Sequence, residues 1–502
     1  MTDYILTALQ TAATSPLLLA VIAFGVACGL IIGSIPGLTS TMALALLVPV
    51  TFGMEFEVAI ALLMGVYCGA ISGGLVGAIM LNIPGTPASA ATCLDGYPMA
   101  AKGQVSRALG LGVYASMIGG TLSGLALVFI APALADFALS FGPWEYFAII
   151  VCTFFTIASL SGGETLKAIA VAFFGMCISL IGYSESVGAS RFTFGISDLE
   201  GGISVMPALI GAFALPQLIM DTDRIGITVN RVRARFVLKD FMAAIWEVLS
   251  VRWALLRSTL IGIGIGILPG VGPGLSNILS YGRAREASPT PEKFGKGELP
   301  ESIVAPEAAN NASMGGALVP MLTLGIPGDA STLMLLGALM LHDIEPGPLL
   351  FIEHGGYVAF IFVSFFLAFA FCVIFYHLLI GIIIRVLTIP TQYIVPVIFA
   401  LCVVGCYVLN NRIFDVYCLL AFGLLGYALR IANFPILPLI LGLILGPMAE
   451  EQLRLALEYG QGSFLPFITR PLSGTIVVLT LVSASIPLWR RFRRASAVTP
   501  SH

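Results

Sequence analysis

Long apolar runs recur along the whole chain, and they constrain its fold more than any other feature. One example is LLMGVYCGAISGGLVGAIML, which covers residues 62–81. Of the 502 residues, 58% are hydrophobic and only 10% are charged, whereas about one quarter of a soluble protein is charged. Apolar runs of about 18 residues or more are typical of membrane-spanning helices, and the alternating strands of an outer-membrane barrel are absent. The sequence therefore predicts an all-α polytopic membrane protein.

Proline–glycine pairs interrupt these apolar runs, and they do so twice in the same order. IPGL from Ile35 matches LPGV from Leu268, an offset of 268 − 35 = 233 positions. GGLVGAIMLNIPGTPAS from Gly73 resembles GALVPMLTLGIPGDAST from Gly316, an offset of 316 − 73 = 243 positions. Each half of the chain therefore carries a first break, a short apolar piece, a span and a second break.

The charges of the loops reverse between the two halves. Loop 51–57 has two acids and no Lys or Arg, whereas its counterpart 283–301 has four Lys or Arg beside four acids. Loop 101–107 has two Lys or Arg and no acid, whereas its counterpart 342–356 has three acids and no Lys or Arg. Because Lys and Arg mark cytoplasmic loops, the two halves should have opposite orientations. Inverted-topology repeats with broken or re-entrant helices are an architecture of ion-coupled transporters.

We predict four parts of the chain. They are a first membrane repeat (1–220), a cytoplasmic linker with an interfacial amphipathic helix (221–257), a second membrane repeat (258–470), and a last span with a basic cytoplasmic tail (471–502). An ordinary basic loop is the alternative for the linker. The distribution of Lys and Arg over these parts puts the N-terminus in the periplasm and the C-terminus in the cytoplasm. The basic residues that it leaves on the outer side are Arg191, Arg412, Arg454 and Arg470.

The breaks are the predicted binding sites. A helix that restarts after a break presents free N–H groups and a positive dipole end, which suit a carboxylate, and nearby hydroxyl and amide groups add ligands. The predicted substrate-binding residues are Gly37, Thr39, Ser40, Gly85, Thr86, Ser89, Ser276, Asn277, Gly328, Ser331 and Thr332. The carbonyl groups that end the preceding helix suit a cation. The predicted cation-coupling residues are Asn82, Asn310, Asn311, Gly325 and Asp329. We expect a span over 314–341, so Asn310 and Asn311 would lie just before it.

A structural interpretation of the same residues stays open. The breaks can be plain helix ends or packing kinks, and Asp329 can cap the restarted helix. An acid in the middle of an apolar segment is nevertheless a candidate functional residue.

The sequence contains none of the short motifs that mark enzymes or cofactor sites. GxxxxGK[ST], GxGxxG, HExxH and GxSxG are absent. The four histidines do not cluster, the nine cysteines lie mostly in apolar segments, and no basic, aromatic patch suggests nucleic acid. We therefore expect a carrier driven by an ion gradient and not an enzyme, with no cofactor, no metal site and no nucleic-acid partner.

Five stretches resemble a known family. They are GSIPGLTSTMALALLVP, NIPGTPASAATCLDGYPMA, GILPGVGPG, PESIVAPEAANNA and LTLGIPGDASTLMLLGAL. Together they resemble the TctA family, the large membrane subunit of tripartite tricarboxylate transporters, over nearly the whole chain and without a departure in these motifs.

The resemblance implies a permease in the bacterial inner membrane that works with a small membrane subunit and a periplasmic solute-binding protein. It also implies carboxylate substrates such as citrate, symport with sodium ions or protons, and elevator-like alternating access. The alternatives are a free-standing carboxylate:cation symporter, an intramembrane enzyme and an ion channel.

Replacing Asp329 with asparagine tests the cation-coupling prediction. The change removes a charge and keeps a side chain that can cap a helix, so we expect transport to depend less on the driving ion. Uptake measured across an ion titration checks this. An unchanged titration curve would remove Asp329 from the cation site.

Overall fold

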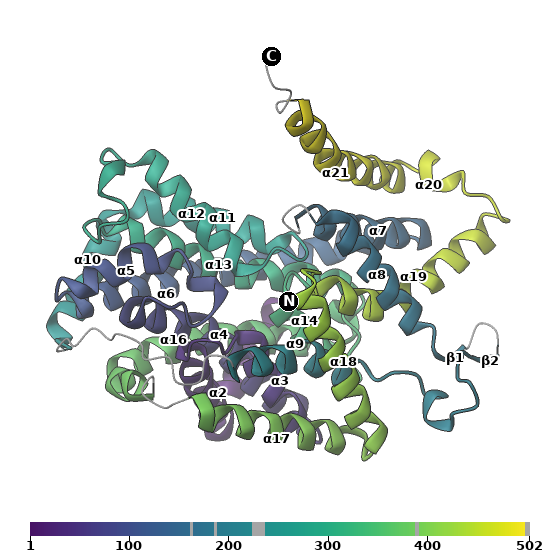
Figure 1. The fold of residues 1–502 in the computed structure, drawn as a ribbon, viewed down its shortest axis with the longest axis horizontal. Helices are drawn as coiled ribbons and strands as arrows, with labels where there is room; N and C mark the ends of the chain where they lie inside the picture. The colour runs from purple at the N-terminus through teal and green to yellow at the C-terminus, as the bar shows by residue number, and fades with distance from the viewer. Residues whose placement is uncertain (161–163, 185–187, 223–235, 387–390, 497–502) are drawn as a thin grey trace. The chain divides into compact units, whose positions relative to one another are not determined.

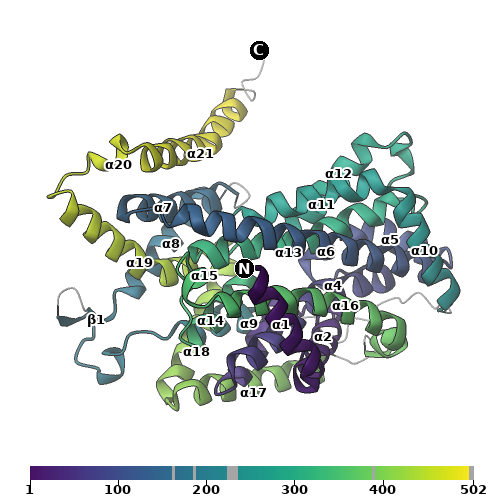
Figure 2. The same ribbon diagram turned by 180° about the vertical axis from the view of Figure 1, so that it is seen from behind.

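The computed structural model describes residues 1–502 except 161–163, 185–187, 223–235, 387–390 and 497–502. The described residues are mostly helical, and their strand structure is one short hairpin (Figures 1 and 2). They form two compact units. Unit 1 is Met1–Asp136 with Gln217–Gly405, and unit 2 is Phe137–Pro216 with Cys406–His502. The all-α prediction is confirmed.

Unit 1 contains both pairs of predicted breaks. Its elements, in which η marks a 3₁₀ helix, are α1 (Thr2–Thr14), α2 (Pro16–Ser34), α3 (Ser40–Leu47), η1 (Pro49–Thr51), α4 (Phe56–Leu81), η2 (Pro87–Ser89), α5 (Thr92–Ala101), α6 (Val105–Ala138), α10 (Leu238–Ser250), α11 (Arg252–Ile267), α12 (Gly272–Ala287), η4 (Pro291–Lys293), α13 (Glu301–Leu324), α14 (Ala330–Leu341), α15 (Leu350–Glu353), α16 (Gly355–Val386) and α17 (Thr391–Asn410). Almost every residue of α4 and α13 is buried, so these two helices form the centre of unit 1.

Unit 2 consists of shorter helices and the hairpin. Its elements are α7 (Pro143–Leu160), α8 (Thr165–Ser179), β1 (Gly182–Ser184), β2 (Ala189–Arg191), η3 (Ser197–Leu199), α9 (Val205–Thr222), α18 (Ile413–Ile431), α19 (Leu437–Tyr459), α20 (Pro466–Thr469) and α21 (Pro471–Ser496). Strands β1 and β2 are antiparallel, with Gly182 opposite Arg191.

Six helices among the described residues are long and apolar enough to cross a membrane. They are α2, α4, α6, the Gly355–Leu378 part of α16, the Gln392–Asn410 part of α17, and α18. The pair α10 and α11, which meet at 82°, adds a seventh candidate if it counts as one span. Large hydrophobic side chains such as Phe24, Phe129 and Leu260 are exposed on these helices, as lipid-facing residues are. The chain is a multi-pass membrane protein.

The same close helix pair occurs in each half of the chain. A Cβ atom on Gly33 of α2 would lie 2.0 Å from the carbonyl oxygen of Ala70 in α4. A Cβ atom on Gly266 of α11 would lie 2.2 Å from the carbonyl oxygen of Ser313 in α13. Gly266 and Ser313 are the counterparts of Gly33 and Ala70 at the two offsets. Small residues let helix backbones approach closely in lipid, so the sequence repeat is also a packing repeat.

The two copies contact each other reciprocally. The short helix α3 of the first copy reaches α14 of the second, where the Ser40 and Ser331 hydroxyls are 2.8 Å apart. The counterpart of α3 is α12, and its Gly274 lies against Pro87 of the first copy. Such an exchange of equivalent contacts is what a two-fold relation produces. The opposite orientation of the copies in the bilayer stays a prediction.

The four predicted parts are ranges of the sequence, whereas the two compact units are groups of residues that pack together in space. Because the break helices of each copy pack on those of the other, pieces of both copies lie in unit 1. The boundaries at 220, 257 and 470 therefore stay a prediction.

One predicted span is wrong. We expected a single span over 314–341, but α13 begins at Glu301 and ends at Leu324, and α14 starts at Ala330. Asn310 and Asn311, which we expected just before a span, lie inside α13. The polar residues of α13 are compatible with a helix at this depth because protein, and not lipid, surrounds them.

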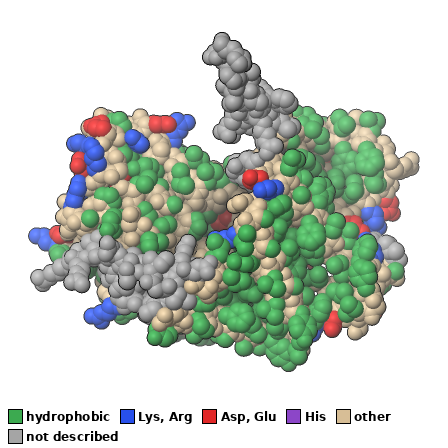
Figure 3. All heavy atoms as spheres, in the orientation of Figure 1, with side chains coloured by type: hydrophobic (Ala, Val, Ile, Leu, Met, Phe, Trp, Pro, Cys, Tyr) green, Lys and Arg blue, Asp and Glu red, His purple; other side chains and the backbone are tan. Residues whose placement is uncertain are grey.

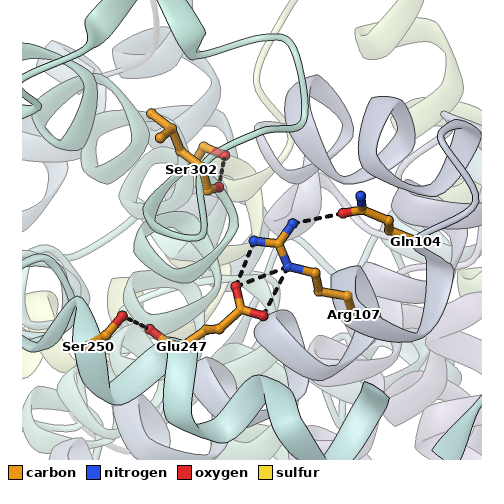
Figure 4. Close-up of polar contacts among 6 residues, drawn as sticks. Gln104, Arg107, Glu247, Ser250 and Ser302 are labelled. Carbon is orange, nitrogen blue, oxygen red and sulfur yellow. Dashed lines mark hydrogen bonds and ion pairs between the residues drawn. The ribbon is translucent and has the colours of Figure 1, made fainter. Parts of the chain in front are cut away.

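The linker helix α10 packs on α6 through one face, with Phe241, Ala244 and Val248 buried. Figure 4 shows the ion pair that joins the two helices. The Arg107 guanidinium donates to the Glu247 carboxylate, with Nη2 2.6 Å from Oε2. The opposite face exposes Trp246, which fits an interfacial helix. Position at the interface stays a prediction, and linker residues 223–235 lie outside the described part.

Charged side chains gather at the end of unit 1 where α10 and the α12–α13 connection lie (Figure 3). Both signs occur there, because Lys102 pairs with Glu298 at 3.5 Å and Arg283 pairs with Glu286 at 2.7 Å. This is the face that the sequence assigns to the cytoplasm. That assignment stays a prediction.

The four basic residues predicted on the outer side are all held by partners within unit 2. Arg191, Arg454 and Arg470 pair with Glu450, Glu458 and Glu145, and the Arg412 guanidinium donates to the Asp198 carbonyl. An arginine with a local partner is a weaker orientation signal than a free one. The orientation of the chain in the membrane stays a prediction.

Two alanine substitutions in α11 test the glycine contacts. A methyl group at Gly266 would meet the α13 backbone, whereas one at Gly264 would point into open space. We expect Gly266→Ala to destabilise the fold by about 1–3 kcal/mol through overpacking, and Gly264→Ala to be neutral or stabilising by up to about 1 kcal/mol. Thermal unfolding of both variants in detergent measures the difference. Equal melting temperatures would contradict the repeated helix pair.

Candidate functional site

The four breaks have the backbone geometry that a chain reversal inside a helix requires. Gly37 and Gly270, in the first break of each copy, have φ of 95° and 79°. Asn82 and Gly325, which end α4 and α13, have φ of 56° and 68°. These left-handed conformations favour glycine and asparagine. The sequence places both types at equivalent positions.

The breaks contact each other or the helix pair beside them. The Gly270 N–H donates to the Gly328 carbonyl at 2.8 Å, and the Gly85 N–H donates to the Gly74 carbonyl at 3.2 Å. A Cβ atom on Gly85 would lie 2.1 Å from the Gly33 carbonyl oxygen. The breaks therefore satisfy part of their own backbone polarity, as lipid requires.

Hydroxyl groups from both copies meet where α3 reaches α14. The Ser331 hydroxyl lies 2.8 Å from that of Ser40 and 3.3 Å from that of Thr41. All three side chains are buried. The structure thus brings together two predicted substrate-binding residues that are 291 positions apart.

In the second copy, the restarted helix is capped by its own side chains. The Asp329 carboxylate accepts the Thr332 N–H at 2.7 Å and the Thr332 hydroxyl at 2.8 Å. The Thr332 hydroxyl oxygen also accepts the Asp329 N–H at 2.9 Å. The capping interpretation of Asp329 is therefore what the structure shows. A role in binding a cation stays a prediction.

In the first copy, the same two positions lack this box. Thr86 and Ser89 are the counterparts of Asp329 and Thr332. The buried Thr86 hydroxyl has no hydrogen-bond partner among the described residues, and the buried Ser89 hydroxyl, which makes no hydrogen bond of normal geometry, lies near the Glu307 carboxylate. Both hydroxyls face the space above Gly74 of α4, where a Cβ atom would lie 2.6 Å and 2.8 Å from them. Buried polar groups are rarely left unpaired. This turn is therefore the best candidate for a ligand.

The chemistry of the two turns differs. A carboxylate already occupies the N-terminus of α14, so a second anion would be repelled there. The Gly85–Ser89 turn is neutral and offers hydroxyl groups. Which ion each turn binds stays a prediction.

A third group of polar residues lies behind the Gly85–Ser89 turn. The Asn277 side chain accepts the Ala91 N–H at 2.7 Å and donates to the Pro306 carbonyl at 3.1 Å. The Asn310 amide donates to the Ala88 carbonyl at 2.8 Å. Both asparagines thus tie the α12 and α13 helices of the second copy to the turn of the first.

Asn311 extends this group towards α4. Its amide donates to the Asn310 side chain at 2.6 Å, and its carbonyl oxygen accepts the Ser72 hydroxyl at 2.8 Å. Asn310 and Asn311, both predicted as cation-coupling residues, are fully buried and lie in one network.

The remaining predicted residues have local roles. The Thr39 hydroxyl caps α3 by accepting the Met42 N–H, and the Ser276 hydroxyl donates to the Pro273 and Ala309 carbonyls. Asn82 is exposed at the end of α4. These contacts leave their predicted binding roles untested.

Our sequence reasoning missed Glu307. This acid is fully buried in α13, and its carboxylate accepts hydrogen bonds from Thr92, Ser116 and Asn310. The rule that singled out Asp329 also applies to Glu307, because an acid at membrane depth is a functional candidate. We did not apply it because the span that we expected began at residue 314, after Glu307.

Two equivalent valine substitutions separate the binding role from the structural one. Thr332→Val removes the capping box and should destabilise the fold by about 1 kcal/mol. Thr86→Val removes a hydroxyl without a protein partner, so stability should stay equal or rise while carboxylate uptake falls. Melting temperature and uptake are measured for both variants. Normal uptake by Thr86→Val would exclude this hydroxyl as a ligand.

Comparison with known proteins identifies the family of the chain. The model of the tripartite tricarboxylate transporter TctA family matches residues 19–441. The chain is 34% identical over 467 residues to an uncharacterized 52.8 kDa protein in the TAR-I ttuC' 3'region of Agrobacterium vitis, covering 92% of each chain. It is 36% identical over 224 residues to an uncharacterized protein in the TAR-II ttuC' 3'region of the same organism, covering 45% of this chain and 92% of that one.

No solved structure matches the chain. The matched family implies a membrane transport protein and not an enzyme, and one that works with other subunits of a tripartite system. With the family matched over most of its length, the chain belongs to the tripartite tricarboxylate transporter TctA family.

Proposed function

We propose that the chain is the permease subunit of a receptor-dependent, cation-gradient-driven secondary transporter of the bacterial inner membrane. It imports tricarboxylates, such as citrate, or related carboxylates. Its proposed partners are a small membrane subunit and a periplasmic solute-binding protein. Family membership supports the transporter class, and the absence of enzyme motifs in the sequence agrees with it.

The observation that carries the proposal is the Gly85–Ser89 turn. Two buried hydroxyl groups lie at this break, whose own side chains are uncharged: that of Thr86, which has no partner among the described residues, and that of Ser89, which lies near the Glu307 carboxylate. Hydroxyl groups and free N–H groups at a helix break bind carboxylates. We place one substrate carboxylate there.

The driving cation, a sodium ion or a proton, has its own candidate groups. Asp329 supplies a buried carboxylate at the second-copy break, and the carbonyl groups near Asn82 and Gly325 end their helices at the breaks. A buried carboxylate is costly unless a cation or a proton neutralises it. Binding of the cation at such a group is therefore favourable.

We further propose alternating access by an elevator-like movement. The break helices of the two copies hold each other through reciprocal contacts, such as that of Ser40 with Ser331, so they can move as one body with the substrate. In this proposal the N-terminus is periplasmic and the C-terminus cytoplasmic.

Proteoliposomes test the proposed function. Vesicles are prepared with this chain, its small membrane subunit and its solute-binding protein, and uptake of radiolabelled citrate is measured with an inward gradient of sodium ions or of protons. We expect saturable, gradient-dependent uptake that requires the binding protein. In the control, an ionophore collapses the ion gradient.

Each other outcome favours an alternative. Uptake without the binding protein would indicate a free-standing symporter. Unsaturable flux that only follows the citrate gradient would indicate a channel, and chemical conversion of the substrate would indicate an intramembrane enzyme. No uptake of any carboxylate in a panel would refute the proposal.

A further inference from the structure

Glu307 of α13 carries a carboxylate that is completely buried. Three neutral groups donate hydrogen bonds to it. The Thr92 hydroxyl is 2.5 Å from Oε1, and the Ser116 hydroxyl and the Asn310 amide are 3.1 Å and 3.2 Å from Oε2. The donors come from α5, α6 and α13, so three helices meet around this one side chain.

No lysine, arginine or histidine forms an ion pair with Glu307 among the residues that the structure describes. Of the other buried acids in the described part of the chain, Glu145 has a cationic partner, whereas Asp95, Asp329 and Asp415 accept hydrogen bonds from neutral groups, as Glu307 does. Glu145 pairs with Arg470, and Asp95 accepts the Tyr281 hydroxyl and the Gly295 and Gly297 N–H groups. An unpaired buried charge is unfavourable, so Glu307 needs another way to lose its charge.

The donor set decides between a proton and a metal cation. Thr92, Ser116 and Asn310 can point hydrogen atoms at both carboxylate oxygens, where a sodium ion would need lone pairs. The Asn310 amide also donates to the Ala88 carbonyl, which holds its NH₂ group in this orientation. A proton can join the carboxylate when one hydroxyl group turns from donor to acceptor, whereas the Asn310 NH₂ group has no lone pair to offer a sodium ion.

The position of Glu307 links its charge to the proposed substrate. Thr92 is the first residue of α5, and Ser89 lies near the carboxylate, so Glu307 stands directly behind the Gly85–Ser89 turn. A charged Glu307 repels a carboxylate at that turn across a low-dielectric interior. A protonated Glu307 does not, and substrate and proton therefore favour each other's binding.

We propose that Glu307 is the group that carries the coupled proton, taking it up when the carboxylate binds and releasing it when the carboxylate leaves. The proposal rests on the proposed function, since it names the cation and the residue that binds it. Asp329 keeps its capping role in this scheme. Asn277 is a positioning residue, because its amide donates to Thr92 at 3.4 Å.

The first experiment compares Glu307→Gln with the wild-type chain in the complete transporter. Citrate affinity, measured as the half-saturating concentration, is followed from pH 5 to 9. For the wild type we expect a loss of about tenfold per pH unit on the alkaline side, because one proton is required. Glutamine is neutral at every pH, so the variant should show a flat profile on the alkaline side, where citrate itself stays fully ionised, and should still exchange citrate without accumulating it against a gradient.

A matched control uses the same substitution at an exposed acid. Glu298 lies on the loop before α13 and pairs with Lys102 at 3.5 Å. Glu298→Gln should keep the wild-type pH profile. If Glu307→Gln keeps that profile as well, the proposal is overturned while the proposed function stands.

A second measurement needs no substrate and no partner. The carbonyl stretching band of protonated carboxylic acids is followed by infrared difference spectroscopy while the purified full chain is titrated. We expect a titrating band that is present in the wild type and in Glu298→Gln and is missing in Glu307→Gln. A band that survives in Glu307→Gln would overturn the proposal even if that variant cannot transport.

Two results separate the two proposals. A wild-type chain that transports no carboxylate but shows the Glu307 band refutes the proposed function only. A variant that loses sodium dependence and keeps its pH dependence assigns Glu307 to sodium, and so overturns the proton proposal.

Discussion

The structure depends on one constraint, which is that lipid cannot satisfy the backbone groups of a broken helix. In unit 1 the breaks meet it by close backbone contact. The Gly270 N–H bonds the Gly328 carbonyl, and the Gly85 N–H bonds the Gly74 carbonyl. These contacts need glycine, because a Cβ atom on Gly85 or Gly328 would lie 2.1 Å or 2.7 Å from a carbonyl oxygen of the neighbouring helix. Tight glycine packing thus comes first, and the polar groups of the breaks are arranged around it.

Repetition of the fold does not imply repetition of the chemistry. The same turn ends in Asp329 and Thr332 in one copy and in Thr86 and Ser89 in the other, and only the first pair forms a capping box. The turn at Asp329 therefore carries an acid whose hydrogen bonds are made within the turn. The turn at Thr86 carries no charged side chain, and its hydroxyl groups do not form such a box. This difference supports a carrier that binds an anion together with a cation.

The sequence predicted the fold class and the breaks well, because both depend on local patterns. Three such patterns each extend over only a few helical turns: the apolar runs, the Pro-Gly pairs and the four-residue spacing of glycines. The errors also came from local reading. The apolar run 314–341 continues through a break, and Asn310, Asn311 and Glu307 fall in a polar stretch that resembles a loop. Their stretch is helical because surrounding protein, which a local pattern does not reveal, buries it.

By itself, the sequence determined that this chain is a polytopic helical protein with two similar halves, each broken twice. Only the tertiary structure decided which polar residues meet. Ser40 reaches Ser331 across 291 positions, and Thr92 reaches Glu307 across 215. The physical reason is that a break depends on the residues beside it, whereas a buried hydrogen bond depends on how helices from both halves pack.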